Sequence, residues 1–160
     1  MQSKNELIQN FTQARAQLQS LLPQVDPHVE VYPGWTIKEL LAHLAGWDDA
    51  TIQSLKTFTT GQPPVVLVDR GADFYNAQVI DQRKELAFQQ IVREWEWVGG
   101  QLSALLDQLP DENLTADIVS PWGQTFPVVQ LLEIMIQHEE EHADAIRAAM
   151  NNSKPSEHKH

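Results

Sequence analysis

The sequence predicts an all-α protein, built as a bundle of four long helices. Four segments repeat their apolar residues every three or four positions, which is the period of an amphipathic helix. No pair of segments shows the alternation of strands, since the one candidate, PPVVLV at 63–68, has no partner. A chain of 160 residues suits one core, so we expect a single domain over 1–150 and a disordered tail at 151–160.

The first two predicted helices each begin at a capping box. Ser3 and Glu6 stand three residues apart before the first stripe, and Thr36 and Glu39 repeat this spacing after a Pro-Gly turn at 33–34. The first apolar stripe is Leu7, Phe11, Ala14, Leu18 and Leu21. The second stripe is Leu40, Leu44, Trp47, Thr51, Leu55 and Phe58, and we expect Gly61 to end this helix.

The last two predicted helices are bounded less sharply. The third begins near Phe88 and ends before Pro110, which cannot continue a helix. Its stripe is Phe88, Ile91, Trp95, Val98, Leu102, Leu105 and Leu109. The stripe of the fourth is Val128, Leu131, Met135, His138, His142, Ala145 and Ala149.

The connection between the second and third helices is long. Residues 61–80 provide about 20 residues, far more than an antiparallel hairpin needs. A helix of ~20 residues spans about 30 Å, and an extended return over that distance takes roughly 10 residues. The sequence therefore favours an up-down-down-up bundle whose second and third helices run parallel, with a short helical segment at 74–79.

The composition limits the partners. A net charge of −11 argues against nucleic acid and against an anionic membrane surface, so we expect neither as a partner. The chain has no cysteine, no apolar run typical of a secretory signal and no segment that could span a bilayer, so we expect it to be cytoplasmic. The expected partner is a small molecule, a metal or another protein.

Residues 138–142 read HEEEH and match the H-E-x-x-H motif of zinc proteases. At ~100° per residue, His138 and His142 lie near the centre of the apolar stripe. Glu140 points to solvent, and Glu139 and Glu141 flank the stripe, so we expect the glutamates to form a mostly water-facing edge. Two inward imidazoles four residues apart can hold a divalent metal at ~2.1 Å from each nitrogen. The alternatives are a buried hydrogen-bonded pair and an exposed pair without function.

A metal site needs a third ligand, and His43 is the only other histidine in a predicted amphipathic helix. A protease is disfavoured, because no H-x-x-G-x-x-H extension follows His142 and no edge strand is predicted to hold a peptide. Imidazole ligands suit zinc, nickel, copper and iron alike.

Two blocks resemble the DinB-like (YfiT-like) four-helix bundle superfamily: GWTIKELLAHLAGWD at 34–48 and IMIQHEEEHADAIR at 134–147. The resemblance extends from about Glu6 to Met150. It implies parallel second and third helices, and homodimers are common in this family. It also implies a divalent metal, most often zinc or nickel, held by three histidines that correspond to His43, His138 and His142. Family members include metal-dependent thiol transferases, isomerases and hydrolases of reactive small molecules.

These inferences lead to a metal-dependent hydrolase or low-molecular-weight-thiol transferase acting on a small electrophile. Trp47 could wall the pocket, Glu39 and Asp48 could accept the ring N–H of His43, and Asn76 could reach the site from the long connection. Each also has a plain structural interpretation as core, cap or solvated residue. The alternatives are a non-catalytic small-molecule-binding or stress-resistance protein with the metal as an anchor, and a structural dimerisation module. No catalytic residue stands out.

Overall fold

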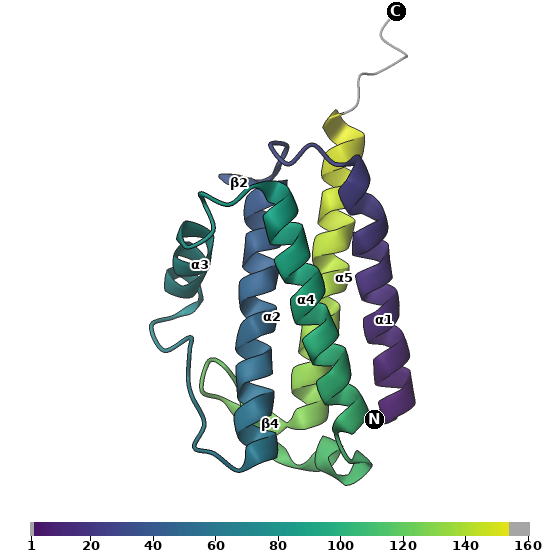
Figure 1. Cartoon of the computed structure of the whole chain (residues 1–160), viewed down its shortest axis with the longest axis vertical. Helices are drawn as coiled ribbons and strands as arrows, with labels where there is room; N and C mark the ends of the chain where they lie inside the picture. The colour runs from purple at the N-terminus through teal and green to yellow at the C-terminus, as the bar shows by residue number, and fades with distance from the viewer. Residues whose placement is uncertain (1, 154–160) are drawn as a thin grey trace, which may run out of the picture.

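The computed structural model describes residues 2–153, and its four long helices form a bundle (Figure 1). These helices are α1 (Lys4–Leu21), α2 (Ile37–Thr60), α4 (Phe88–Gln108) and α5 (Val128–Ser153). In Figure 1, α1 and α5 run upward while α2 and α4 run downward, so the predicted up-down-down-up topology is confirmed. The helix α5 extends past the predicted boundary at residue 150, and the rest of the predicted tail, residues 154–160, lies outside the described residues.

The helix ends follow from local hydrogen bonding. Both predicted capping boxes are present, with the Ser3 and Thr36 side chains accepting the backbone N–H groups of Glu6 and Glu39. The helix α2 ends at Gly61, whose φ of 68° is left-handed and therefore favours glycine. Short 3-10 turns follow α1 at Leu22–Gln24 and α4 at Asp111–Thr115.

Two small antiparallel hairpins precede α2 and α5, and the sequence did not reveal them. Strands β1 (Glu30–Tyr32) and β2 (Trp35–Thr36) form the first, and β3 (Asp117–Val119) and β4 (Thr125–Pro127) form the second. Strands of two or three residues are too short for alternation to be recognised. The segment 63–68, the one strand candidate, belongs to neither hairpin and has no regular secondary structure.

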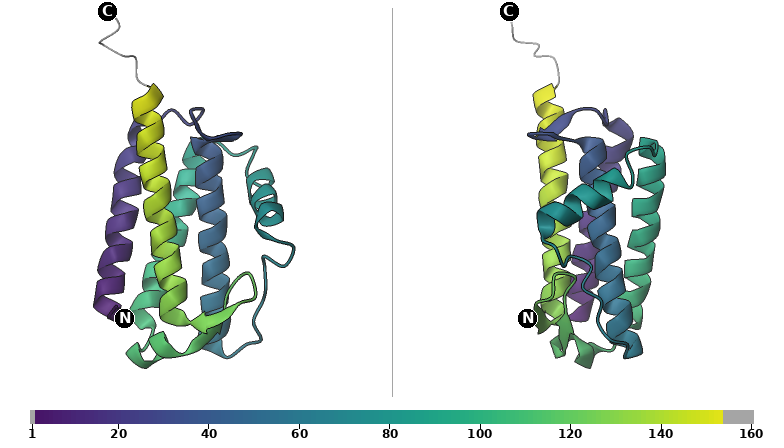
Figure 2. Two further views of the ribbon diagram at one scale, coloured as in Figure 1. Left: turned by 180° about the vertical axis from the view of Figure 1, so that it is seen from behind. Right: turned by 90° about the vertical axis from the view of Figure 1, so that its left-hand side faces the viewer.

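The long connection contains the predicted short helix, α3 (Ala72–Asp81), which lies across the outside of α2 (Figure 2). Glycine allows this close approach, because a Cβ at Gly46 would lie 2.7 Å from the Val79 Cβ. The Tyr75 hydroxyl donates a 2.9 Å hydrogen bond to the Gly46 carbonyl oxygen. These contacts fix α3 against the middle of α2, next to His43 and Trp47.

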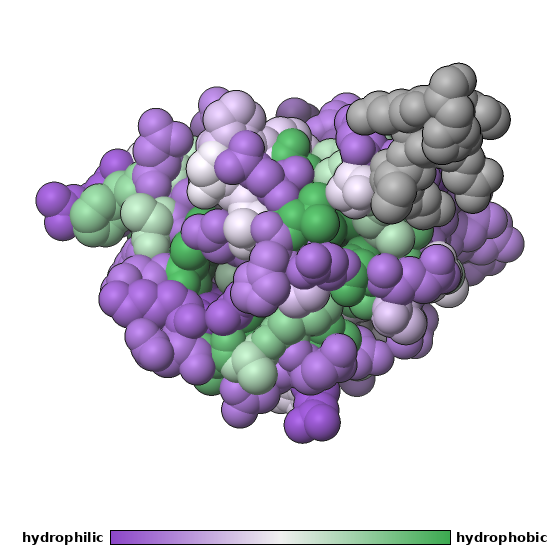
Figure 3. All heavy atoms as spheres, turned by 90° about the horizontal axis from the view of Figure 1, so that it is seen from above, coloured by the Kyte–Doolittle hydropathy of each residue, from purple (hydrophilic) through white to green (hydrophobic). Residues whose placement is uncertain are grey.

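Within the bundle, α2 packs mainly on α4, and α1 packs mainly on α5. Figure 3 views the end where α1 finishes and α2 begins, and there hydrophilic side chains surround a smaller hydrophobic area. None of the described helices is long and apolar enough to cross a membrane.

Candidate metal centre

Three histidines from two helices converge in the interior. The candidate ligand atoms of His43 on α2 and of His138 and His142 on α5 all lie within 4.8 Å of one another. The Nε2 atom of His138 is 2.8 Å from that of His43 and 2.9 Å from that of His142. Two nitrogens on one tetrahedral zinc are about 3.4 Å apart, so each of these two contacts of His138 would lengthen by only about half an ångström around a cation.

The protonation of His43 follows from its neighbours. The indole Nε1 of Trp47 is 2.6 Å from Asn76 Oδ1, and an indole N–H can only donate, so the Asn76 atom must be the oxygen. The same oxygen is 2.8 Å from His43 Nδ1, which must therefore carry the proton. A neutral His43 then keeps its lone pair on Nε2, the atom that faces the other two histidines.

A second oriented contact reaches His142. The Tyr32 hydroxyl, from β1, lies 3.2 Å from His142 Nδ1. When Nδ1 of His142 carries the proton, it donates a hydrogen bond to the Tyr32 oxygen, and Nε2 of His142 keeps its lone pair. The Trp35 ring of β2 lies 5.1 Å from the His43 ring, so the first hairpin covers this side of the cluster.

All three imidazoles are held neutral. Burial, and after it repulsion from His138, lower the pKa of His43 to about 4, although the hydrogen bond to Asn76 opposes this fall. Burial and the neighbouring His142 lower the pKa of His138 to about 3. Burial and the neighbouring His43 lower the pKa of His142 to about 4. Neutral imidazoles with converging lone pairs are the donor set that zinc and other divalent transition metals accept, so the residues present fit such a cation.

The other residues singled out in the sequence divide into two groups. Trp47 and Asn76 join the cluster through the hydrogen bonds just described. Glu39 and Asp48 do not take the expected place beside the His43 ring N–H, because Asn76 occupies it. Glu39 closes the capping box of α2, whereas Asp48 turns toward Arg15.

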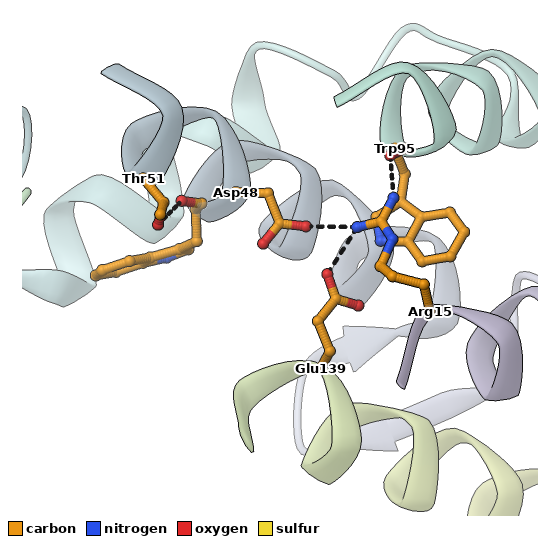
Figure 4. Close-up of polar contacts among 6 residues, drawn as sticks. Arg15, Asp48, Thr51, Trp95 and Glu139 are labelled. Atoms are coloured by element: carbon orange, nitrogen blue, oxygen red, sulfur yellow. Dashed lines mark hydrogen bonds and ion pairs between the residues drawn. The ribbon is translucent and has the colours of Figure 1, made fainter. Parts of the chain in front are cut away.

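Arg15 is the centre of a buried polar cluster that sequence reasoning missed (Figure 4). Its Nη1 lies 2.9 Å from Asp48 Oδ2 and 2.8 Å from Glu139 Oε1, and both carboxylates are almost fully buried, at 1% and 0% exposed. Its Nη2 donates to the Trp95 carbonyl oxygen on α4, and its guanidinium carbon lies 3.6 Å from the Trp95 ring centroid. Burial and the neighbouring Glu139 raise the pKa of Asp48, and Arg15 opposes this rise.

The prediction that Glu139 lies at a water-facing edge was therefore wrong. The helix α5 packs against α1 as well as α2, so its buried face is about twice as wide as the predicted stripe. A second row of buried residues contains Glu139 and consists of Leu132, Ile136, Glu139, Ala143 and Ile146. The available signal was Arg15, a charge placed four residues after Phe11 and three before Leu18 in the first stripe.

A pocket of about 700 Å³ lies beside the histidines, and His43 and His138 form part of its wall. Trp47 and Trp122 both line it and pack against each other, with ring centroids 6.2 Å apart. Its volume is in the range of small-molecule sites.

A family model of the DinB superfamily matches residues 28–146, the segment that holds all three histidines. The chain belongs to the DinB superfamily. No curated protein matches the sequence significantly.

Solved structures share this DinB-superfamily fold at low sequence identity. YfiT from Bacillus subtilis, described as a probable metal-dependent hydrolase with an unusual four-helix bundle topology, is 17% identical with a TM-score of 0.74, covering 93% of this chain and 86% of its own. A mycothiol-dependent maleylpyruvate isomerase is 19% identical with a TM-score of 0.73, covering 91% of this chain and 63% of its own. At these identities the likeness shows the fold alone.

A third relative corrects one prediction. The colibactin self-resistance protein ClbS, solved in complex with double-stranded DNA, is 13% identical with a TM-score of 0.78, covering 94% of this chain and 96% of its own. The exclusion of nucleic acid as a partner was therefore wrong as an inference from net charge. Net charge sums the whole surface, whereas DNA binding depends on the charge of the contacting face.

Proposed function

We propose that the protein is a metal-dependent enzyme acting on a small reactive electrophile, by hydrolysis or by transfer of a low-molecular-weight thiol. The observation that supports this most strongly is the convergence of three imidazole Nε2 atoms beside a pocket of about 700 Å³. His43, His138 and His142 would bind one divalent cation, with zinc or nickel as the expected metal. Two proteins of the same fold support it: YfiT is described as a probable metal-dependent hydrolase, and the maleylpyruvate isomerase is mycothiol-dependent.

Each nearby residue has a defined part in this proposal. Asn76 and Tyr32 hold the outer nitrogens of His43 and His142 and so fix the direction of both rings. Three protein ligands leave a coordination position for substrate or water, and a bound cation there supplies Lewis acidity and lowers the pKa of water or of a thiol. The apolar pocket wall keeps bulk water away from the reacting group.

A second candidate is a non-catalytic protein that sequesters a reactive compound, with the metal as an anchor. One observation favours it. Asp48, the buried carboxylate of the pocket wall, is bound to Arg15 rather than directed at the histidines. Among the described residues, the pocket therefore lacks an acid–base pair beside the three imidazoles.

Metal analysis of the purified full-length chain tests the centre. We expect about one divalent metal ion per chain, lost when His138→Ala and His142→Ala are combined. His28→Ala is the matched control, because His28 is an exposed histidine on a loop and belongs to no cluster. Retention of full metal content in the double variant would contradict the proposed centre.

Turnover separates the two candidates. The metal-loaded protein is assayed against activated esters, and against thiol-reactive electrophiles with low-molecular-weight thiols, before and after chelation. Multiple turnovers that stop on chelation support the enzyme. Consumption of no more than one equivalent per chain, with tight binding, supports sequestration instead.

A further inference from the structure

We infer that the pocket beside the three histidines accepts a non-anionic aromatic compound and rejects carboxylates and phosphates of the same size. This inference rests on the proposed function, which places the reacting group at the three histidines. It adds to that function the chemical class of the compound that binds. It follows from the apolar wall of the pocket, from its two indoles and from the sign of its charges.

The wall is largely apolar. Apart from Ala72, six of its side chains are hydrophobic, namely Trp47, Val68, Trp122, Leu131, Ile134 and Met135. They come from α2, the connection before α3, the second hairpin and α5. Burying an apolar ligand surface here is favoured by about 25 cal/mol for each Å² removed from water.

The two indoles select a flat ring. The Trp47 and Trp122 centroids are 6.2 Å apart with the ring planes inclined by 53°, and each indole is only partly buried. Each N–H is already bound, that of Trp47 to Asn76 and that of Trp122 to Gln124. The indoles therefore offer ring surface rather than hydrogen-bond donors to a ligand, and aromatic rings pack well on such surfaces.

The charges of the wall are acidic. Asp48 and Asp69 line the pocket, and no lysine or arginine does so among the described residues. Arg15 compensates Asp48 from the side of α1, whereas Asp69 is exposed on the connection before α3. An anionic ligand would thus meet like charge and no basic partner except a bound cation.

The neutral donors of the wall are few. The Thr51 hydroxyl donates to the Trp47 carbonyl oxygen within α2, so it is already used. The Asn76 oxygen is used twice, by His43 and Trp47, so among the side-chain hydroxyl and amide groups of the wall the Asn76 amide N–H groups are the donors left for a ligand. One amide donor can orient a carbonyl or hydroxyl oxygen, but it cannot replace the hydration of a carboxylate.

The experiment uses the metal-free full-length protein and three ligands with one shared ring: 2-naphthalenemethanol, 2-naphthylmethylammonium and 2-naphthoate. Isothermal titration calorimetry gives each Kd. We expect the alcohol and the ammonium to bind at least about tenfold more tightly than the carboxylate. Metal-free protein is required, because a bound cation would attract naphthoate by itself.

Three variants test the assigned surfaces. Trp122→Ala should weaken the alcohol and the ammonium by about tenfold through loss of one ring face. Trp97→Ala is the matched control, since Trp97 is 63% exposed on α4 and does not line the pocket, and it should change nothing. Asp69→Asn should reduce the preference for ammonium over carboxylate without changing the binding of the alcohol.

Tight binding of naphthoate to the metal-free protein would overturn the inference, and so would an unchanged affinity in Trp122→Ala. Absence of binding by all three ligands would overturn it as well, while leaving metal binding and turnover intact. If the naphthalene ligands bind as expected and no metal is found in the protein, the pocket assignment is supported and the proposed function fails instead.

Discussion

Replacing Arg15 by methionine should destabilise the protein strongly. The side chain is 11% exposed, and its Nη1 alone contacts both Asp48 and Glu139. Methionine fills much of the space but cannot compensate either carboxylate. The Arg15 variant would leave two acidic groups facing each other in the interior without a cation.

The expected cost follows from the charges left behind. Removing one partner of a buried ion pair typically costs about 3–5 kcal/mol, which for a chain of this length lowers Tm by roughly 6–20 °C. The loss of unfolding free energy in Arg15→Met should depend on pH. Burial and the neighbouring Glu139 already raise the pKa of Asp48, and loss of Arg15 raises this pKa further above its unfolded value, so the folded variant binds a proton more readily than the unfolded chain. Its stability relative to the parent is therefore greatest at low pH and falls as pH rises toward 7.

Urea denaturation followed by far-UV circular dichroism measures this difference at pH 5 and pH 7, in chelator. Arg147→Met is the matched control, because Arg147 pairs with Asp144 at the surface, where an ion pair contributes about 1 kcal/mol or less. Combining Arg15→Met with Asp48→Asn and Glu139→Gln should recover part of the loss. A deficit below about 1 kcal/mol at pH 7, or one that does not shrink at pH 5, would refute the reasoning.

Three further predictions concern the metal centre and its support. Asn76→Ala removes the acceptor that fixes His43, so zinc affinity, measured by competition with a chromogenic chelator, should fall about 10–100-fold; an unchanged affinity would exclude this orienting role. Gly46→Ala places a methyl group against Val79 and should cost about 1–3 kcal/mol of unfolding free energy in urea, whereas the exposed Gly100→Ala, which meets no neighbour, should not destabilise. In metal-free protein, the pKa of His43 is lowered to about 4, so on acidification the unfolded chain protonates this histidine at a higher pH than the folded protein does. The free energy of unfolding should therefore fall between about pH 6.5 and pH 4, by about 3 kcal/mol for one such histidine. Calorimetric unfolding across this range checks the last expectation, and a flat profile would contradict it.

The parts of the fold that were predictable are those with local signals. The capping boxes at Ser3 and Thr36 and the stop at Gly61 are short-range interactions, and each appears where its residues predict it. The parallel arrangement of α2 and α4 followed from chain length alone, since residues 61–87 are enough to return along a helix of this size. The candidate ligands were accessible for a similar reason, because two histidines four residues apart on a stripe face the core together.

The parts that were missed depend on contacts distant in sequence. A single helical wheel assumes one buried face, but α5 packs on α1 and on α2, and this second contact buries Glu139. Likewise, Asp48 is a plausible partner for His43 by spacing, yet a guanidinium from α1, 33 residues earlier in the chain, takes it. Asn76 was only one of several polar residues in a long connection until α3 was placed against α2.

The two polar clusters explain how the halves of the bundle keep their spacing. Apolar packing joins α2 to α4 in one half of the bundle and α1 to α5 in the other. Because apolar packing is non-directional, it leaves the α2–α4 pair some freedom to slide on the α1–α5 pair. His43 facing His138, and Arg15 bridging Asp48 and Glu139, are directional contacts that cross between the pairs. Buried ionic groups rarely add net stability over apolar replacements, so their presence at core positions is better explained by geometry. The Arg15 cluster fixes α2 relative to α5, which is the distance on which the approach of His43 to His138 and His142 depends.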